Sequence, residues 1–201
     1  MDFSTTELAE IVSTRTCHDL IGNIGTLKNV LELIEPNTPL DGDTQNLLDG
    51  VSFVLNARQK FFRMAFGLET HAATAEDLLK LCADYVSTVG THGYPIQLNL
   101  RGASPQLSKP VCLCVMIAAD VFIRSGSIDI DINKDNITVR AVTDFKFNEN
   151  EIADYQKIIA NQRPESNISQ YAQLIYLRNV LGENVPMKLN VNANEMTLVI
   201  G

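Results

Sequence analysis

Residues 36–43 read Pro-Asn-Thr-Pro-Leu-Asp-Gly-Asp, and this stretch decides how the first third of the chain folds. Two prolines, a glycine and several short polar side chains in close succession cannot continue a helix and are typical of a loop. The sequence predicts a long helix on either side of it. Because the loop is short, we expect the two helices to run antiparallel, as a hairpin.

The helix before the loop is expected over residues 5–35 and the helix after it over about 44–68. Ser4 followed by Glu7 is a capping box that begins the first helix. Apolar residues of the first helix recur at intervals of four and three, as in a coiled coil. These apolar residues form a seam along the helix. Two helices bury only one such seam, so we expect the hairpin to pair with a second copy. The seam residues are Leu20, Ile24, Leu27, Leu31 and Ile34.

After about residue 70 the pattern changes to short helices mixed with strands. Thr74 followed by Asp77 caps the first of these helices, and Gly182 ends the last. We therefore predict an α+β chain with two domains, 1–70 and 71–201, the second an α/β sandwich with helices over one face of a mixed sheet. The expected helices are 74–89, 108–123, 149–160 and 168–181, and the expected strands are 96–100, 128–132, 137–142, 187–191 and 196–200.

Composition and charge exclude several classes of protein. The 201 residues carry 24 acids against 16 bases, a formal charge of −8 that argues against a nucleic-acid partner and favours a protein or a small molecule. The N-terminus lacks a signal peptide, and the longest apolar run, 110–119, is half a membrane span. We expect a soluble cytoplasmic protein that contacts no membrane. None of the four cysteines forms a CxxC pair, so no metal site is expected.

One of the three histidines stands out. His71 and His92 lie in predicted linkers, where an exposed surface residue is the simpler interpretation. At about 100° per residue, His18 lies about 160° from Leu20 and so points away from the apolar seam. A neutral imidazole is a competent nucleophile. Asp19 either interacts with the ring nitrogen that is not under attack or is an ordinary acid of the helix surface.

The side of the helix that carries His18 also carries Arg15, Gly22, Gly25 and Asn29, and is therefore poor in bulky side chains. A glycine inside a helix costs about 1 kcal/mol relative to alanine, so two of them so close together need a reason. One reason is access, because a surface of small residues lets another protein approach the histidine. The alternative is close packing of this face against the second domain.

Three cations of the second helix lie at the height of His18. Folding the hairpin at its loop places His18 level with Phe61, and hence near Arg58, Lys60 and Arg63. Cations beside an exposed imidazole suit a phosphoryl group or an acidic partner. The alternative is a solvated basic face with no such role.

Two segments resemble a known family. Residues 17–20 (Cys-His-Asp-Leu), in a long helix that turns back into one ending with 62–67 (Phe-Arg-Met-Ala-Phe-Gly), resemble the ChpT-type bacterial histidine phosphotransferases. These proteins are built like the dimerisation and ATPase-like parts of sensor histidine kinases. The resemblance extends over essentially the whole chain, because the order of elements after residue 70 is similar to that of the kinase ATPase-like fold.

The resemblance implies a function and a set of site residues. His18 would accept a phosphoryl group from a receiver-domain aspartate of a hybrid histidine kinase and pass it to another response regulator. The protein would be a homodimer whose hairpins form a four-helix bundle, and Mg²⁺ would come with the receiver domain. The implied catalytic residues are His18 and Asp19, and the implied partner-binding residues are Arg15, Gly22, Gly25, Asn29, Arg58 and Arg63.

The departures from the kinase pattern concern nucleotide binding. Asn23 stands where kinases commonly have a proline, and the stretch 109–123 has no asparagine for a nucleotide box. Residues 144–148 read Asp-Phe-Lys-Phe-Asn where a kinase has Asp-x-Gly-x-Gly, and 163–168 has no glycine to wrap phosphates. We therefore expect no ATP binding and no cofactor. A non-catalytic dimeric scaffold that binds response regulators is the main alternative, and a residual ATP-dependent kinase is the other.

Overall fold

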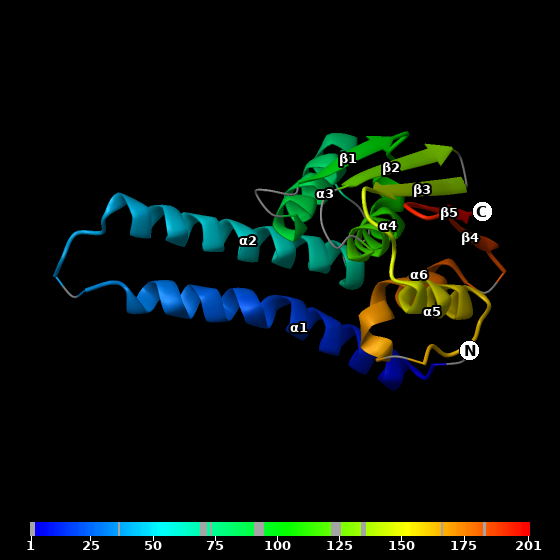
Figure 1. The fold of residues 1–201 in the computed structure, drawn as a ribbon, viewed down its shortest axis with the longest axis horizontal. Coiled ribbons are helices and arrows are strands. Elements are labelled where there is room, and N and C mark those ends of the chain that lie inside the picture. The colour runs from blue at the N-terminus through cyan, green and yellow to red at the C-terminus, as the bar shows by residue number, and fades with distance from the viewer. Residues whose placement is uncertain are drawn as a thin grey trace.

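Two long helices, α1 (Thr5–Glu32) and α2 (Gly42–Phe66), run antiparallel and project from an α/β unit (Figure 1). The hairpin and the α+β class are thus confirmed. The structure is a computed structural model, and it describes residues 3–35, 37–68, 72, 74–90, 95–121, 126–133, 136–165, 167–182 and 184–201.

Helix α1 begins as expected and ends earlier than expected. The Ser4 hydroxyl accepts the amide hydrogen of Glu7 and the Glu7 carboxylate accepts the amide hydrogen of Ser4, so the capping box is confirmed. The last helical residue is Glu32 rather than residue 35. Leu33 and Ile34 donate to carbonyls three residues back, at 3.1 and 3.3 Å, so the chain tightens and leaves the α-helical path here.

Helix α2 is fixed at both ends. It begins at Gly42, two residues before the expected start, because the Asp41 carboxylate caps it by accepting the Thr44 amide hydrogen at 2.7 Å. Near its other end Phe61 is fully buried and stacks on Tyr85 of α3 (Ala75–Val89), with ring centroids 3.8 Å apart. This stack joins the hairpin to the α/β unit.

The five predicted strands form one mixed sheet in the order β1-β2-β3-β5-β4. The β1–β2 pair is parallel and the other pairs are antiparallel. Helices pack on one face of the sheet, as predicted, and apolar residues of the central strands are buried beneath them (Figure 1). The strands are β1 (Ile96–Arg101), β2 (Gly126–Asn133), β3 (Asn136–Thr143), β4 (Met187–Val191) and β5 (Glu195–Ile200).

The apolar helix α4 (Ser108–Asp120) forms the centre of this layer. Every residue from Pro110 to Ala119 is buried, as the apolar run 110–119 requires. The helix ends at Asp120 rather than residue 123. It packs against α6 (Ala172–Leu181) and α3, and α5 (Glu149–Ile159) packs against α6 and β4. Gly182 ends α6 with a φ of 83°, a conformation that favours glycine.

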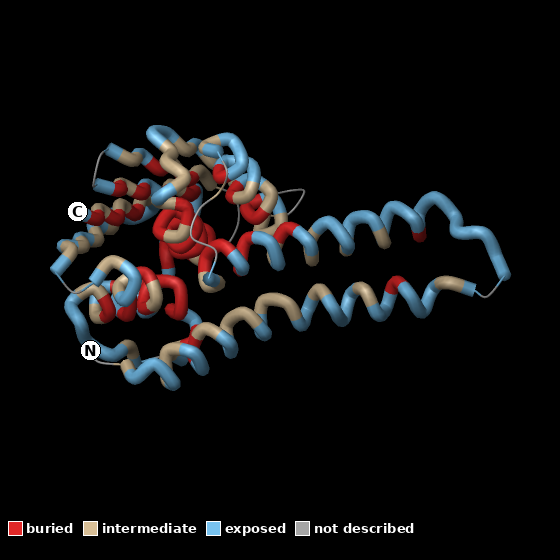
Figure 2. Tube along the Cα trace, turned by 180° about the vertical axis from the view of Figure 1, so that it is seen from behind, coloured by how far each residue is buried: buried red, intermediate tan, exposed pale blue. Residues whose placement is uncertain are grey.

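One apolar core extends from the α/β unit into the base of the hairpin. Ile11 of α1 and Phe61, Phe62, Met64 and Ala65 of α2 belong to the same cluster as the residues of α4. The rest of the hairpin is mostly exposed (Figure 2). The division at residue 70 therefore stays a prediction, since a single core extends across it.

Two residues of the predicted seam are exposed in the single chain, Ile24 at 55% and Leu31 at 51%. Among the described residues, no helix combines the length and the apolar composition that a membrane span requires.

Candidate functional site

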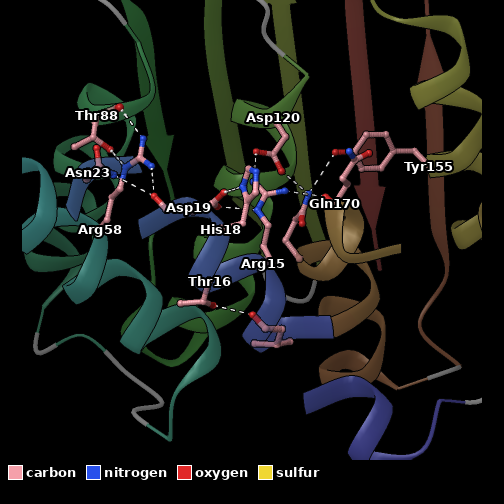
Figure 3. A network of polar contacts seen from close by, with 12 residues as sticks. Arg15, Thr16, His18, Asp19, Asn23, Arg58, Thr88, Asp120, Tyr155 and Gln170 are labelled. Atoms are coloured by element: carbon pink, nitrogen blue, oxygen red, sulfur yellow. Dashed lines mark hydrogen bonds and ion pairs between the residues drawn. The ribbon is translucent and has the colours of Figure 1, made fainter. Parts of the chain in front are cut away.

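His18 lies on the exposed side of α1 and its side chain is 83% exposed (Figure 3). Its Nδ1 is 3.3 Å from Oδ1 of Asp19. An ionised carboxylate only accepts hydrogen bonds, so this contact favours the neutral tautomer that carries its proton on Nδ1. The Nε2 lone pair is then directed away from Asp19 and is available as a nucleophile. Of the two interpretations of Asp19, the geometry favours the one in which it interacts with the ring.

The carboxylate of Asp19 is held from the other side by Arg15. The guanidinium Nε of Arg15 lies 2.7 Å from Oδ2 of Asp19, one helical turn along α1. The same guanidinium donates from Nη2 to Oδ1 of Asp120 at 2.7 Å and from Nη1 to the carbonyl of Gln170 at 2.8 Å. Asp120 is the last residue of α4, so this arginine links α1 to the α/β unit.

The backbone of Asp19 is held as well. Its carbonyl oxygen accepts hydrogen bonds from Nη1 of Arg58 at 2.8 Å and from Nδ2 of Asn23 at 3.1 Å. Arg58 also donates to the hydroxyl of Thr88 at 3.1 Å and to its carbonyl at 2.9 Å. The helical turn that carries His18 is therefore tied to α2 and α3 through its main chain, and to α4 through a side chain.

The charges around Arg15 are desolvated. Burial raises the pKa of Asp120 to about 6, although the charge of Arg15 opposes the shift. Burial lowers the pKa of Arg15, but Asp120 and Asp19 outweigh it and the pKa ends above its ordinary value. Only 14% of the Arg15 side chain and 15% of the Asp120 side chain are exposed. This pair is therefore far less screened by water than a surface ion pair.

The glycines beside His18 are open to solvent. A Cβ added to Gly22 or to Gly25 would meet no described atom within 4 Å. The alternative that this face packs closely against the second domain is therefore wrong for Gly22 and Gly25 in the single chain, whereas Arg15 on the same face does contact it. Asn29 is exposed too, and Ile21, next to this surface, is 69% exposed. The surface beside His18 is small, partly apolar and accessible.

The predicted cations do not gather around His18 as free charges. Arg15 and Arg58, both expected to bind a partner, make the contacts within the chain described above, and their contact with a partner stays a prediction. Lys60 and Arg63 lie on another part of the surface, where they line a cavity of about 230 Å³ together with Asp77 of α3. Of the three predicted cations of α2, Arg58 contacts the backbone carbonyl of Asp19, so the level predicted from the hairpin is confirmed for this residue.

Asp120 is the residue of this network that the sequence analysis missed. The signal was present, because Asp120 is the one polar residue in the otherwise apolar stretch 110–123. A carboxylate at the end of a buried helix needs a cation or a cluster of donors. Which cation this is could be known only from the fold, because Arg15 is 105 positions away.

Other candidate sites are weaker. The described residues include no group of three or more His, Cys, Asp or Glu side chains that could hold a metal ion. Cys82, Cys112 and Cys114 are buried free thiols and Cys17 is exposed. The two histidines of the predicted linkers, at positions 71 and 92, lie outside the described residues.

Comparisons with known proteins agree with this picture. No family model matches the chain. The protein phosphotransferase ChpT of Brucella abortus (strain 2308) is 24% identical over an alignment 201 positions long, which covers 98% of this chain and 95% of that protein.

Among solved structures, one described as a bacterial phosphotransferase superposes with a TM-score of 0.75 at 18% identity, covering 100% of this chain and 98% of the other. A blue-light activated histidine kinase of Erythrobacter litoralis aligns with 91% of this chain and 62% of its own, at 15% identity and a TM-score of 0.45. The predicted resemblance is confirmed: over its whole length, the chain is similar in sequence to a ChpT-type protein phosphotransferase and in fold to a bacterial phosphotransferase.

Proposed function

We propose that this chain is a histidine phosphotransferase of a bacterial two-component phosphorelay, with His18 as the residue that carries the phosphoryl group. The observation that carries this proposal is the state of His18, an exposed imidazole whose Nδ1 faces a carboxylate that is itself fixed. A histidine in the core would be covered, and an ordinary surface histidine would not have such a support.

The chemistry follows from this geometry. The lone pair of Nε2 attacks the phosphorus of a receiver aspartyl phosphate, a P–N bond forms, and the P–O bond to the aspartate breaks. The aspartate leaves as a carboxylate with the electron pair of that bond. The proton on Nδ1 stays, and the positive charge that develops on the ring is offset by Asp19 3.3 Å away. The second transfer, to another receiver aspartate, is the reverse of these bond changes.

The partners are proposed from the same surface. A receiver domain would approach His18 over Gly22, Gly25 and Asn29, all of which are exposed. The donor would be the receiver domain of a hybrid histidine kinase, and Mg²⁺ would belong to the receiver. Two copies of the chain would pair through the hairpin into a four-helix bundle, which would cover Ile24 and Leu31.

We also propose that no ATP is involved. A polar cavity of about 510 Å³ lies between α1, α4 and the start of α5. Its wall includes the carboxylates of Asp120 and Glu151. Burial, with the nearby charge of Asp120, raises the pKa of Glu151 to about 7. Among the described residues of this wall, Arg15 is the one cation and is already paired with Asp120, so the cavity offers no excess positive charge to triphosphate groups. The sequence also has no glycine-rich loop to hold them.

The test is phosphotransfer from a labelled receiver. The protein is mixed with a phosphorylated receiver domain, and label is followed on this chain and then on a second receiver. We expect label on the wild type and none on His18→Gln, with Asp131→Asn, on the distant sheet, as a control that keeps transfer. No label on the wild type, or label on His18→Gln, contradicts the proposal.

The non-catalytic scaffold predicts a different result. In that case a receiver binds the wild type and His18→Gln equally well, and neither chain gains phosphate. Calorimetric titration with an unphosphorylated receiver, run beside the transfer assay, separates the two functions.

A further inference from the structure

Three contacts connect Asp120 of the α/β unit to the imidazole of His18 (Figure 3). Asp120 Oδ1 is 2.7 Å from Nη2 of Arg15, Arg15 Nε is 2.7 Å from Oδ2 of Asp19, and Asp19 Oδ1 is 3.3 Å from Nδ1 of His18. The chain of contacts begins in the buried layer of helices and ends at a ring that faces solvent.

We propose that Asp120 is a positioning residue for His18: it fixes Arg15, Arg15 fixes the carboxylate of Asp19, and Asp19 holds the imidazole with its proton on Nδ1 and Nε2 free. The inference rests on the proposed function. It adds to it a residue of the second domain that touches neither the phosphoryl group nor the imidazole.

The planar guanidinium of Arg15 links the position of Asp120 to the position of the Asp19 carboxylate. Nε and Nη2 belong to one rigid fork, so the position of Asp120 sets the plane in which Nε meets Asp19. The third contact, from Nη1 to the carbonyl of Gln170, fixes the same plane at another point. With all three nitrogens engaged, the guanidinium has no freedom to turn away from Asp19.

The small free energy of an Arg–Asp pair on a helix surface shows why Asp120 is needed. An Arg–Asp pair one turn apart on an exposed helix contributes only about 0.3–0.5 kcal/mol, so it forms for only part of the time. Here both side chains are 14% exposed, and the arginine is anchored at its far side. Its contact with Asp120 therefore holds Arg15 in place, so that the Arg15–Asp19 pair stays formed. His18 has no comparable support of its own, because its side chain is 83% exposed and, among the described residues, its polar contact is with Asp19.

A purely structural role for Asp120 is the competing interpretation. In that role the ion pair with Arg15 only attaches the hairpin to α4, and its loss lowers stability without changing the ring of His18. The protonation of the two ring nitrogens distinguishes the roles. An unconstrained neutral histidine carries its proton mainly on Nε2, whereas a carboxylate at Nδ1 shifts the proton to that nitrogen.

The experiment measures the ring nitrogens of His18 by ¹⁵N NMR in the full chain at alkaline pH, where imidazoles are neutral. Asp120→Asn keeps the shape of the side chain and removes its charge. We expect the Nδ1–H form to dominate in the wild type and the Nε2–H form to increase clearly in Asp120→Asn. The rate constant of phosphotransfer should fall about tenfold while the KM for the receiver stays within about twofold.

Two further variants complete the test. Arg15→Lys keeps the charge and loses the fork, so it should shift the tautomer in the same direction, and it serves if Asp120→Asn does not fold. Asp131→Asn removes an exposed carboxylate that pairs with Arg101 on the sheet, and should leave the tautomer unchanged.

An unchanged tautomer in a folded Asp120→Asn or Arg15→Lys overturns the inference, whatever happens to the transfer rate. This outcome is distinct from failure of the proposed function. If the wild type gains no phosphate, the proposed function fails, and the tautomer measurement still decides whether Asp120 positions the ring.

Discussion

The guanidinium of Arg58 on α2 donates a hydrogen bond to the backbone carbonyl of Asp19 on α1, across 2.8 Å. It also holds the hydroxyl and the carbonyl of Thr88 on α3. One half-buried side chain thus ties the turn that carries His18 to two other helices. A residue predicted to bind a partner thus fixes the frame in which His18 lies, and its contact with a partner stays a prediction.

Replacing Arg58 by lysine should therefore destabilise the protein. A lysine keeps the charge but has a single ammonium group, which cannot reach all three acceptors. We expect the free energy of unfolding to fall by about 2 kcal/mol, which corresponds to roughly 4–8 °C in Tm for a chain of this size. Thermal unfolding measures it. Arg101→Lys, in an exposed pair with Asp131, is the matched control and should change Tm by less than about 2 °C. Equal decreases of Tm in the two variants would contradict the conclusion that Arg58 holds α1, α2 and α3 together.

Most of the fold could be predicted because the sequence signals for its loops, helix ends and strands act locally. The breaker stretch 36–43, the capping box at Ser4, the cap at Thr74 and the alternation of the strands each act within a few residues. The two caps and the strands lie where they were expected, and the described part of the breaker stretch separates the two long helices, although α2 already begins at Gly42. The element ends that moved did so for equally local reasons, such as the cap supplied by Asp41. The parallel pairing of β1 with β2 and the strand order depend on contacts between distant segments.

The site was predictable only in part. Helical geometry alone indicated that His18 points outward, and this needed no tertiary information. The contacts of Arg15 within the chain could not be predicted from the sequence, because its acceptors Asp120 and Gln170 are more than a hundred positions away. A helical projection shows which way a side chain leaves its own helix. It does not show what another element places in its path.

The glycines of α1 give a prediction in which stability and function move in opposite directions. A Cβ at Gly22 or Gly25 meets open space, so alanine should raise the free energy of unfolding by about 1 kcal/mol per site. If a receiver approaches over this surface, the added methyl groups should also raise the KM for transfer. Thermal unfolding and transfer kinetics measure the two effects.

Gly50→Ala on α2 is the control for the glycine prediction, because its Cβ also meets open space. It should stabilise the protein by a similar amount and leave the KM unchanged. A double variant of Gly22 and Gly25 that is more stable and has the wild-type KM would show that receivers do not use this surface.

The exposed seam residues give a prediction about assembly. Ile24 and Leu31 are about half exposed, so aspartate at either position should not disturb the fold of the single chain. In a symmetric dimer each substitution acts twice. Burial of one such side chain contributes about 1.5–3 kcal/mol, so Ile24→Asp should raise the Kd of the dimer by about a hundredfold or more. Analytical ultracentrifugation over a concentration series measures it. A wild type that is monomeric at micromolar concentrations would contradict the proposed dimer.

Asp120 gives a prediction about pH and stability. Its pKa in the folded chain is raised by burial to about 6 from an ordinary value of 3.8. Between these two values the folded state holds a proton that the unfolded state has released. Unfolding then releases a proton, so this group makes the free energy of unfolding fall as the pH rises through this window. The full effect is at most about 3 kcal/mol, because one pKa unit corresponds to about 1.4 kcal/mol.

Urea unfolding of the wild type and Asp120→Asn at several pH values isolates this contribution. Carboxylates whose pKa is lowered, such as Glu7 and Asp41, act in the opposite direction, but they are present in both chains and cancel in the difference. From about pH 4 to about pH 7 the wild type should lose stability relative to Asp120→Asn, with no further relative change above that. A relative gain by the wild type would mean that its pairing with Arg15 outweighs its burial, and that the pKa of Asp120 lies below its ordinary value instead of above it.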